Sequence, residues 1–295
     1  MADKVPLLLA GLALGIAFGA TALRTNFCAM GAVTDILLVG DWRRFRAWML
    51  AIAVALAGTQ ALAMTGLAPI DDSFYLSRAR VWGFVLVGGL VFGFGMVLTG
   101  GCVQRNLVRL GAGSVKALAV LIVFTVFAAL TFWVLPPYDG PWNVLWISDT
   151  GARSLGALVA GLAGVPETTT RVGLTAAIAG GLIAFCLADA GFRSSPRNLA
   201  AGLILGALVP LGWLATTQLG HWRSDSLNFV LPIATGGLAI YDTSFVARFV
   251  GSGFALFGLG AAVGVIVGAA LAVFASGSFR VETFADAPDV GRNLL

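Results

Sequence analysis

Charged residues are scarce in this chain of 295 amino acids, which contains 11% Asp, Glu, Lys and Arg against 59% hydrophobic residues. A soluble globular domain carries about 25% charged residues, so the composition excludes that class. Several windows approach 20 residues with few or no charges, the length that crosses a hydrocarbon core of about 30 Å. The sequence therefore predicts an all-α, polytopic membrane protein embedded in a lipid bilayer.

Metal ligands and disulfide partners are equally few. The cysteines are Cys28, Cys102 and Cys186, none lies in a CxxC pair, and His221 is the only histidine. A zinc site or an iron–sulfur cluster would lack ligands, and an odd cysteine count argues against a disulfide framework. We therefore expect no metal and no cofactor. No P-loop is present, which argues against ATP-driven transport by this chain alone. The net charge of +4 requires no nucleic-acid partner, because cytoplasmic loops of membrane proteins collect Lys and Arg.

The apolar segments are of two lengths. The long ones, which we expect to span the membrane, are 5–23, 47–67, 81–99, 117–135, 172–190, 198–217 and 246–275. The short ones are 27–39, 101–112 and 229–240, which are too short to cross and suit re-entrant half-helices. Trp142 and Trp146 lie beside turn residues in 138–169, as in an interfacial hairpin.

The basic residues predict the orientation of the chain. With the short pieces re-entering, one side of the membrane receives eleven of the eighteen basic residues: Arg24, Arg43, Arg44, Arg46, Arg105, Arg109, Lys116, Arg193, Arg197, Arg280 and Arg292. By the positive-inside rule this side is cytoplasmic. The N-terminus is then extracytoplasmic.

An internal similarity suggests an inverted repeat. Asn26-Phe27 opens a short half-helix from the cytoplasmic side, and Asn228-Phe229 opens one from the opposite side. Broken helices that meet near the bilayer midplane form the substrate path in inverted-topology transporters. We therefore expect a first repeat at 1–135, an extracytoplasmic connection at 136–170 and a second, inverted repeat at 171–295. The counterpart of Gly100-Gly101-Cys102 would fall near position 304, so we expect a further C-terminal segment or a small partner protein to complete the pore.

The stretch from Gly93 to Arg109 holds the strongest candidate site. An apolar, glycine-rich run ends in Gly100-Gly101-Cys102, and Arg105 and Arg109 follow on one helical face. A thiol held at such a break suits a substrate pathway, and the two arginines would attract an anion at its mouth. The alternative is a helix C-cap with Cys102 as a small apolar filler and two positive-inside arginines.

Arg24-Thr25-Asn26-Phe27-Cys28, followed by Gly100-Gly101-Cys102 and then Arg109-Leu-Gly-Ala-Gly-Ser114, resembles the YeeE/YedE family of sulphur-transport membrane proteins. The resemblance implies a bacterial inner-membrane protein for thiosulfate uptake, with inverted repeats forming an hourglass. It further implies cysteines along a narrow central path that contact the sulfur end of the anion in turn. Carried over to this sequence, these are Cys102 first and Cys28 second. Val230 stands where the inverted half would place its thiol.

The leading hypothesis is accordingly a transporter, not an enzyme, for thiosulfate or a related sulfur anion. Its substrate path would include Cys102, Cys28, Gly100, Gly101, Asn26 and Asn228, with helix N-termini and neutral thiols as weak donors. The alternatives are a membrane thiol or sulfur-transfer protein with Cys102 as nucleophile, and an accessory subunit without transport of its own.

For the remaining candidate residues we expect structural roles. We expect Cys186 to be inert packing. Asp35 would pair with Arg24 or Arg105, and Asp189 would sit at the interface with Arg193. His221 is expected to be a loop residue.

Overall fold

The computed structural model describes residues 5–73, 82–134, 154–220, 225–241 and 254–284. The described chain is helical, with one isolated parallel bridge between Ser114 and Glu282. Six helical stretches are long and apolar enough to cross a membrane: Val5–Val39, Arg43–Met64, Leu86–Gly111, Glu167–Leu187, Pro196–Leu219 and Leu256–Ala275. A shorter apolar helix covers Val115–Thr131. The predicted all-α, multi-pass membrane architecture is confirmed.

The helices follow the predicted segments closely. They are α1 (Val5–Thr25), α2 (Ala29–Val39), α3 (Arg43–Met64), α4 (Trp82–Leu98), α5 (Val103–Gly111), α6 (Val115–Val134), α7 (Leu155–Ala163), α8 (Glu167–Leu187), α9 (Ala190–Arg193), α10 (Pro196–Leu219), α11 (Val230–Tyr241) and α13 (Phe254–Ala275), with a 3₁₀ turn at Ile70–Asp72. The helix α8 begins five residues before the apolar segment, because its first turn is polar and follows Pro166. The short helix α9 was not predicted.

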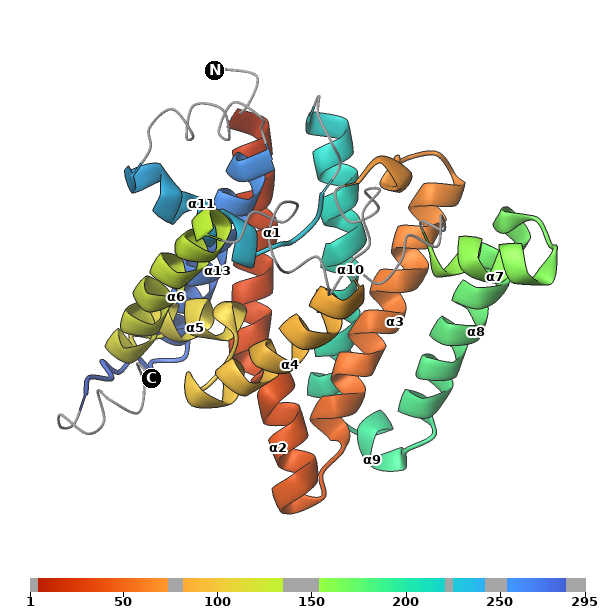
Figure 1. Cartoon of the computed structure of the whole chain (residues 1–295). Coiled ribbons are helices and arrows are strands. Elements are labelled where there is room, and N and C mark those ends of the chain that lie inside the picture. Colours follow the sequence, from red (N-terminus) through yellow and green to blue (C-terminus); the bar gives the residue numbers. More distant parts are fainter. Residues whose placement is uncertain (1–4, 74–81, 135–153, 221–224, 242–253, 285–295) are drawn as a thin grey trace.

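Glycines allow α1 and α13 to pack in close contact. A Cβ on Gly11, Gly15 or Gly19 would lie 2.1–2.2 Å from a backbone carbonyl oxygen of α13. Reciprocally, a Cβ on Gly260, Gly264 or Gly268 would lie 2.1–2.4 Å from a carbonyl oxygen of α1. Small residues that bring two backbones together are the usual means of helix association in lipid. In Figure 1 these two helices run side by side through the centre of the molecule.

A second helix pair, α3 and α10, packs in the same manner. A Cβ on Gly206 would lie 2.7 Å from the carbonyl oxygen of Ala51, and one on Gly58 would lie 2.8 Å from Pro210 Cγ. The helix α8 packs on the outer side of α3. There the Arg46 guanidinium donates to the carbonyl of Phe185 and stacks over its ring at 4.4 Å.

The two predicted half-helices of the first repeat continue longer helices across a break. α2 extends beyond the end of α1 in Figure 1, toward the edge where α3 begins, and α1 and α2 form one apolar stretch of 35 residues. Likewise α5 follows α4 within the stretch Leu86–Gly111. The helix α5 packs on α13 and α6, and α11 packs on α6 and α13. Both breaks therefore lie inside apolar segments, while re-entry of α2 and α5 into a bilayer stays a prediction.

Candidate functional site at the helix breaks

The break between α4 and α5 is built by two glycines in left-handed conformations. Gly100 has φ 68° and Gly101 has φ 144°, values that side-chain-bearing residues rarely adopt. The N–H of Gly101 donates to the carbonyl of Met96 at 2.9 Å, and this 6→1 bond ends α4. Cys102, in extended conformation, is then the N-cap of α5. The Gly-Gly pair thus lets α4 end and α5 begin with only the four residues 99–102 between them.

The break between α1 and α2 repeats this arrangement. Asn26 takes the left-handed position, with φ 51°, and the N–H of Phe27 donates to the carbonyl of Ala22 at 3.0 Å. Cys28 then caps α2, as Cys102 caps α5. Asn is the residue that most often replaces Gly in this position. Asn26, whose side chain is exposed, therefore has a conformational role in ending α1.

The two capping thiols differ in their surroundings. Cys28 is 4% exposed, and its Sγ accepts a hydrogen bond from the N–H of Gly31 at 3.5 Å. Cys102 is half-buried and makes no side-chain capping hydrogen bond, so the N–H groups in the first turn of α5 are not satisfied by it. Of the two, Cys102 has the thiol that a small molecule can approach.

Cys102 lines a cavity of about 170 Å³ between α4, α5 and α6. Its wall is mainly apolar, from Phe92, Met96, Val120, Leu121 and Phe124, with polar groups from Thr99, Cys102 and Asn106. An engineered cavity of about 150 Å³ holds benzene, so this volume suffices for an anion of five non-hydrogen atoms. The cavity thus combines a thiol, the start of a helix and room for a small molecule.

Asn106 holds the Gly-Gly-Cys turn in place. Its Nδ2 donates to the carbonyl of Gly101 at 3.0 Å and to that of Cys102 at 3.2 Å, and the residue is 1% exposed. Thr99 supports the turn from α4, since its Oγ1 lies 3.0 Å from the Gly101 carbonyl. No donor in the described part of the chain reaches Asn106 Oδ1. Sequence reasoning missed Asn106, although its position four residues after Cys102 on a short helix was a usable signal.

The start of α11 is capped differently. Asn228 Oδ1 accepts hydrogen bonds from the N–H groups of Val230 and Leu231, at 3.0 and 3.1 Å. The Asn228 side chain thus satisfies two N–H groups at the start of α11, which begins at Val230, a residue without a thiol. Its neighbour Phe229 contacts the ring of Phe18 on α1, with centroids 5.1 Å apart.

The three helix starts converge on one apolar core. Phe27, beside Cys28, and Val103, beside Cys102, belong to the same cluster of buried residues, and Phe229 packs against it. The structure therefore gathers around one core the residues next to Cys28, Cys102 and Asn228.

The two predicted anion-attracting arginines lie over the Gly-Gly turn. A Cβ on Gly101 would meet Arg105 Cγ at 2.6 Å, and one on Gly100 would lie 3.3 Å from Arg109 Nη1. Arg109 is also ion-paired, with its Nη2 3.1 Å from Glu282 Oε2. The sequence did not indicate Glu282, which is 173 residues away from Arg109 in the chain.

The remaining cysteine has a structural environment. Cys186 is fully buried, and its Sγ donates to the carbonyl of Arg46 at 3.1 Å, which ties α8 to α3.

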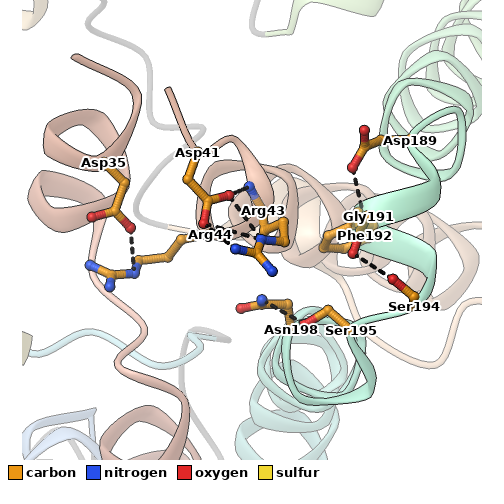
Figure 2. A network of polar contacts seen from close by, with 10 residues as sticks. All are labelled: Asp35, Asp41, Arg43, Arg44, Asp189, Gly191, Phe192, Ser194, Ser195 and Asn198. Atoms are coloured by element: carbon orange, nitrogen blue, oxygen red, sulfur yellow. Dashed lines mark hydrogen bonds and ion pairs between the residues drawn. The ribbon is translucent and has the colours of Figure 1, made fainter. Parts of the chain in front are cut away.

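The charged residues beyond the break sites form a separate polar network at the ends of α2, α3 and α9 (Figure 2). The expected partner of Asp35 was wrong: Asp35 pairs with Arg44 at 3.2 Å, because the start of α3, not Arg24 or Arg105, lies beside α2. Asp189 caps α9 by accepting from the N–H of Phe192 at 2.7 Å. Arg43 donates to Asp41, which lowers the pKa of that carboxyl. His221 and both tryptophans of 138–169 lie outside the described residues.

Comparison with known proteins finds similar chains among sulphur-transport proteins. A thiosulfate transporter, TsuA, of Escherichia coli (strain K12) is 33% identical over 124 residues, which are 42% of this chain and 34% of that protein. A thiosulfate transporter TsuA of Spirochaeta thermophila is 26% identical over 288 residues, or 92% of this chain and 79% of that protein. The first match thus spans about one third of its relative's length. The sequence profile of the family described as sulphur transport matches residues 24–295. This chain belongs to the sulphur-transport family, YeeE/YedE.

Proposed function

We propose that this chain is a channel-like transporter for thiosulfate or a related sulfur anion, which passes Cys102 on its way through the membrane. The observation that carries the proposal is the half-buried, uncapped Cys102 thiol at the wall of a cavity and at the start of α5. Two similar proteins are named thiosulfate transporters, which supports this substrate class.

The polar end of the cavity, where α5 begins, suits a soft divalent anion. Thiosulfate has one polarisable terminal sulfur and three oxygens, and hydrocarbon is hostile to its charge. The first-turn N–H groups of α5 supply a partial positive charge, and the neutral Cys102 thiol is a weak donor to the terminal sulfur. Weak contacts favour passage over trapping. Cys28 would be a second contact further along the path, although its sulfur already accepts from Gly31.

The proposal includes an inverted repeat. In it, α1, α2 and α3 correspond to α10, α11 and α13. The two glycine-mediated helix pairs support this correspondence. When each helix is replaced by its counterpart in the other repeat, the pair α1 and α13 becomes the pair α10 and α3, and both pairs are observed. In this scheme Cys28 and Val230 occupy equivalent helix starts, and Asn26 and Asn228 precede them. A further Gly-Cys break in the second repeat, from a longer chain or a partner protein, stays a prediction.

We also infer that the protein lies in the bacterial inner membrane with an extracytoplasmic N-terminus. The ends of α1, α8 and α13 lie toward the same side as the starts of α3 and α10. On that side lie Lys116 and those arginines of the predicted cytoplasmic set that belong to the described residues. This supports the proposed orientation.

Growth on thiosulfate as the only sulfur source tests the proposal, in a host that lacks its own uptake systems. We expect the wild-type chain to restore growth, Cys102→Ala to abolish it, and Cys186→Ala to retain it. Cys186→Ala is the matched control because it removes a buried thiol that faces the carbonyl of Arg46 rather than the cavity. Equal growth of both variants, at equal membrane expression, would rule out a Cys102 path.

A further inference from the structure

The segment that follows α13 folds back onto the loop between α5 and α6. Gly277, with φ 63°, ends α13, and Phe279 stacks on Phe274 with ring centroids 4.7 Å apart. The N–H of Glu282 then donates to the carbonyl of Gly113 at 3.1 Å, and the N–H of Val115 donates to the carbonyl of Glu282 at 2.8 Å. Two backbone bonds therefore hold the Glu282 backbone beside the loop between α5 and α6.

The Glu282 carboxylate accepts hydrogen bonds from two side-chain donors. Its Oε2 accepts from Ser114 Oγ at 2.6 Å and from Arg109 Nη2 at 3.1 Å. Ser114 is 4% exposed, and its hydroxyl is thus held in place below the surface. A guanidinium and a hydroxyl that converge on one oxygen are the donors that bind sulfur and phosphorus oxyanions. The hydrogen bond from Ser114, together with Arg109 and Lys116, lowers the pKa of Glu282, so the occupant is an anion at neutral pH.

The same guanidinium lies beside the candidate path. Arg109 Nη1 is 3.3 Å from the point where a Cβ on Gly100 would stand, while its Nη2 holds Glu282. Arg109 therefore lies with one nitrogen beside the Cys102 turn and binds the tail with another. An anion leaving the turn toward the end of α5 would meet Arg109 with Glu282 already bound to it.

We propose that Arg109 and Ser114 form an oxyanion site at the mouth of the path, and that Glu282 is its tethered competitor. A tetrahedral divalent oxyanion such as thiosulfate or sulfate displaces the carboxylate, and the carboxylate returns when the anion leaves. An ion pair in which the Glu282 side chain is 49% exposed is weak, which permits this exchange. The role of this site in transport rests on the proposed function, whereas its ability to bind an oxyanion does not depend on that function.

The deciding variant is Glu282→Gln, which keeps the shape and the Ser114 contact but removes the competing charge. In radiolabelled thiosulfate uptake we expect its KM to fall about threefold or more, since a charge-assisted competitor is gone. Arg109→Gln should raise the KM, and the double variant should match Arg109→Gln alone. Asp41→Asn is the control, because it neutralises another arginine-paired carboxylate at a distance from α5. The inference would be overturned if Glu282→Gln had a higher KM, lost uptake or unfolded, because Glu282 would then be required for the structure and not act as a competitor.

A binding measurement separates this inference from the proposed function. Sodium sulfate is titrated into purified wild-type protein, Glu282→Gln, Asp41→Asn and the Arg109→Gln double variant, and the thermal midpoint is followed. We expect the largest sulfate-dependent rise for Glu282→Gln and smaller rises for wild-type protein and Asp41→Asn, in which Glu282 competes with sulfate. The double variant, which lacks the Arg109 donor, should show the smallest rise, which reports the general effect of sulfate. This result holds even if no variant transports thiosulfate. Equal rises in all four proteins would contradict the oxyanion site.

Discussion

The contact between α1 and α13 yields the most quantitative prediction. Replacing Gly264 by Ala places a methyl group 2.4 Å from the carbonyl oxygen of Leu12 and 2.9 Å from the Cα of Gly15. Both neighbours are backbone atoms, so no side chain can rotate away. The helices must separate by about 1 Å to reach an ordinary contact of about 3.5 Å, and the neighbouring glycine contacts are then lost as well.

The expected cost follows from two opposing terms. Overpacking of this kind destabilises by about 1–3 kcal/mol. Alanine is a better helix former than glycine by about 1 kcal/mol, which offsets part of that loss. Gly93→Ala on α4 is the matched control, because nothing lies within 4 Å of its Cβ position and only the propensity term remains. Gly264→Ala should therefore be less stable than Gly93→Ala by about 1–3 kcal/mol.

Thermal unfolding of the two purified variants in the same detergent measures this difference. At about 2–4 °C per kcal/mol for a chain of this size, the midpoint of Gly264→Ala should lie several degrees below that of Gly93→Ala. Equal midpoints would mean that α1 and α13 are not in backbone contact at Gly264, and would refute the packing described above.

Two further predictions concern the site and the tail. Asn106→Ala should lower the free energy of unfolding by about 1–3 kcal/mol and slow uptake, because two hydrogen bonds to the turn are lost. Asn106→Asp should abolish uptake, because it adds a negative charge at the cavity. Unchanged uptake in Asn106→Asp would exclude an anion from this cavity. The pKa of Glu282 is lower in the folded protein than in the unfolded chain, where it is about 4.3. Its contribution to the stability of the tail is therefore present above about pH 4.3 and is lost as the pH falls through the lower pKa of the folded protein. Amide exchange at Val115, corrected for the intrinsic rate, should therefore accelerate only in that acid range, and acceleration near neutral pH would contradict the assignment.

The helices and their breaks were accessible from the sequence because both depend on local chemistry. Apolar runs of membrane length fix the helices, and Gly100-Gly101 and Asn26 mark the left-handed turns that end α4 and α1. The sequence also singled out Cys102, because a thiol held at such a break in an apolar segment suits a substrate pathway.

Long-range partners were not accessible in this way. Asp35 pairs with Arg44 rather than Arg24 or Arg105, which depends on how α2 lies against α3. Glu282 meets Ser114 across 168 residues of sequence, through a tail that composition alone marks only as polar. Contacts of this kind follow from helix packing, and one sequence without its three-dimensional arrangement does not specify them.

The most direct test of the central claim is protection of Cys102 by the substrate. Cys28→Ala/Cys186→Ala protein, in which Cys102 is the remaining thiol, is treated with a small thiosulfonate reagent, with and without thiosulfate, and with sulfate as the control anion. If Cys102 lies on the path, thiosulfate slows its modification in a saturable manner and sulfate slows it less. Modification at the same rate in all three conditions would place Cys102 off the path and contradict the account.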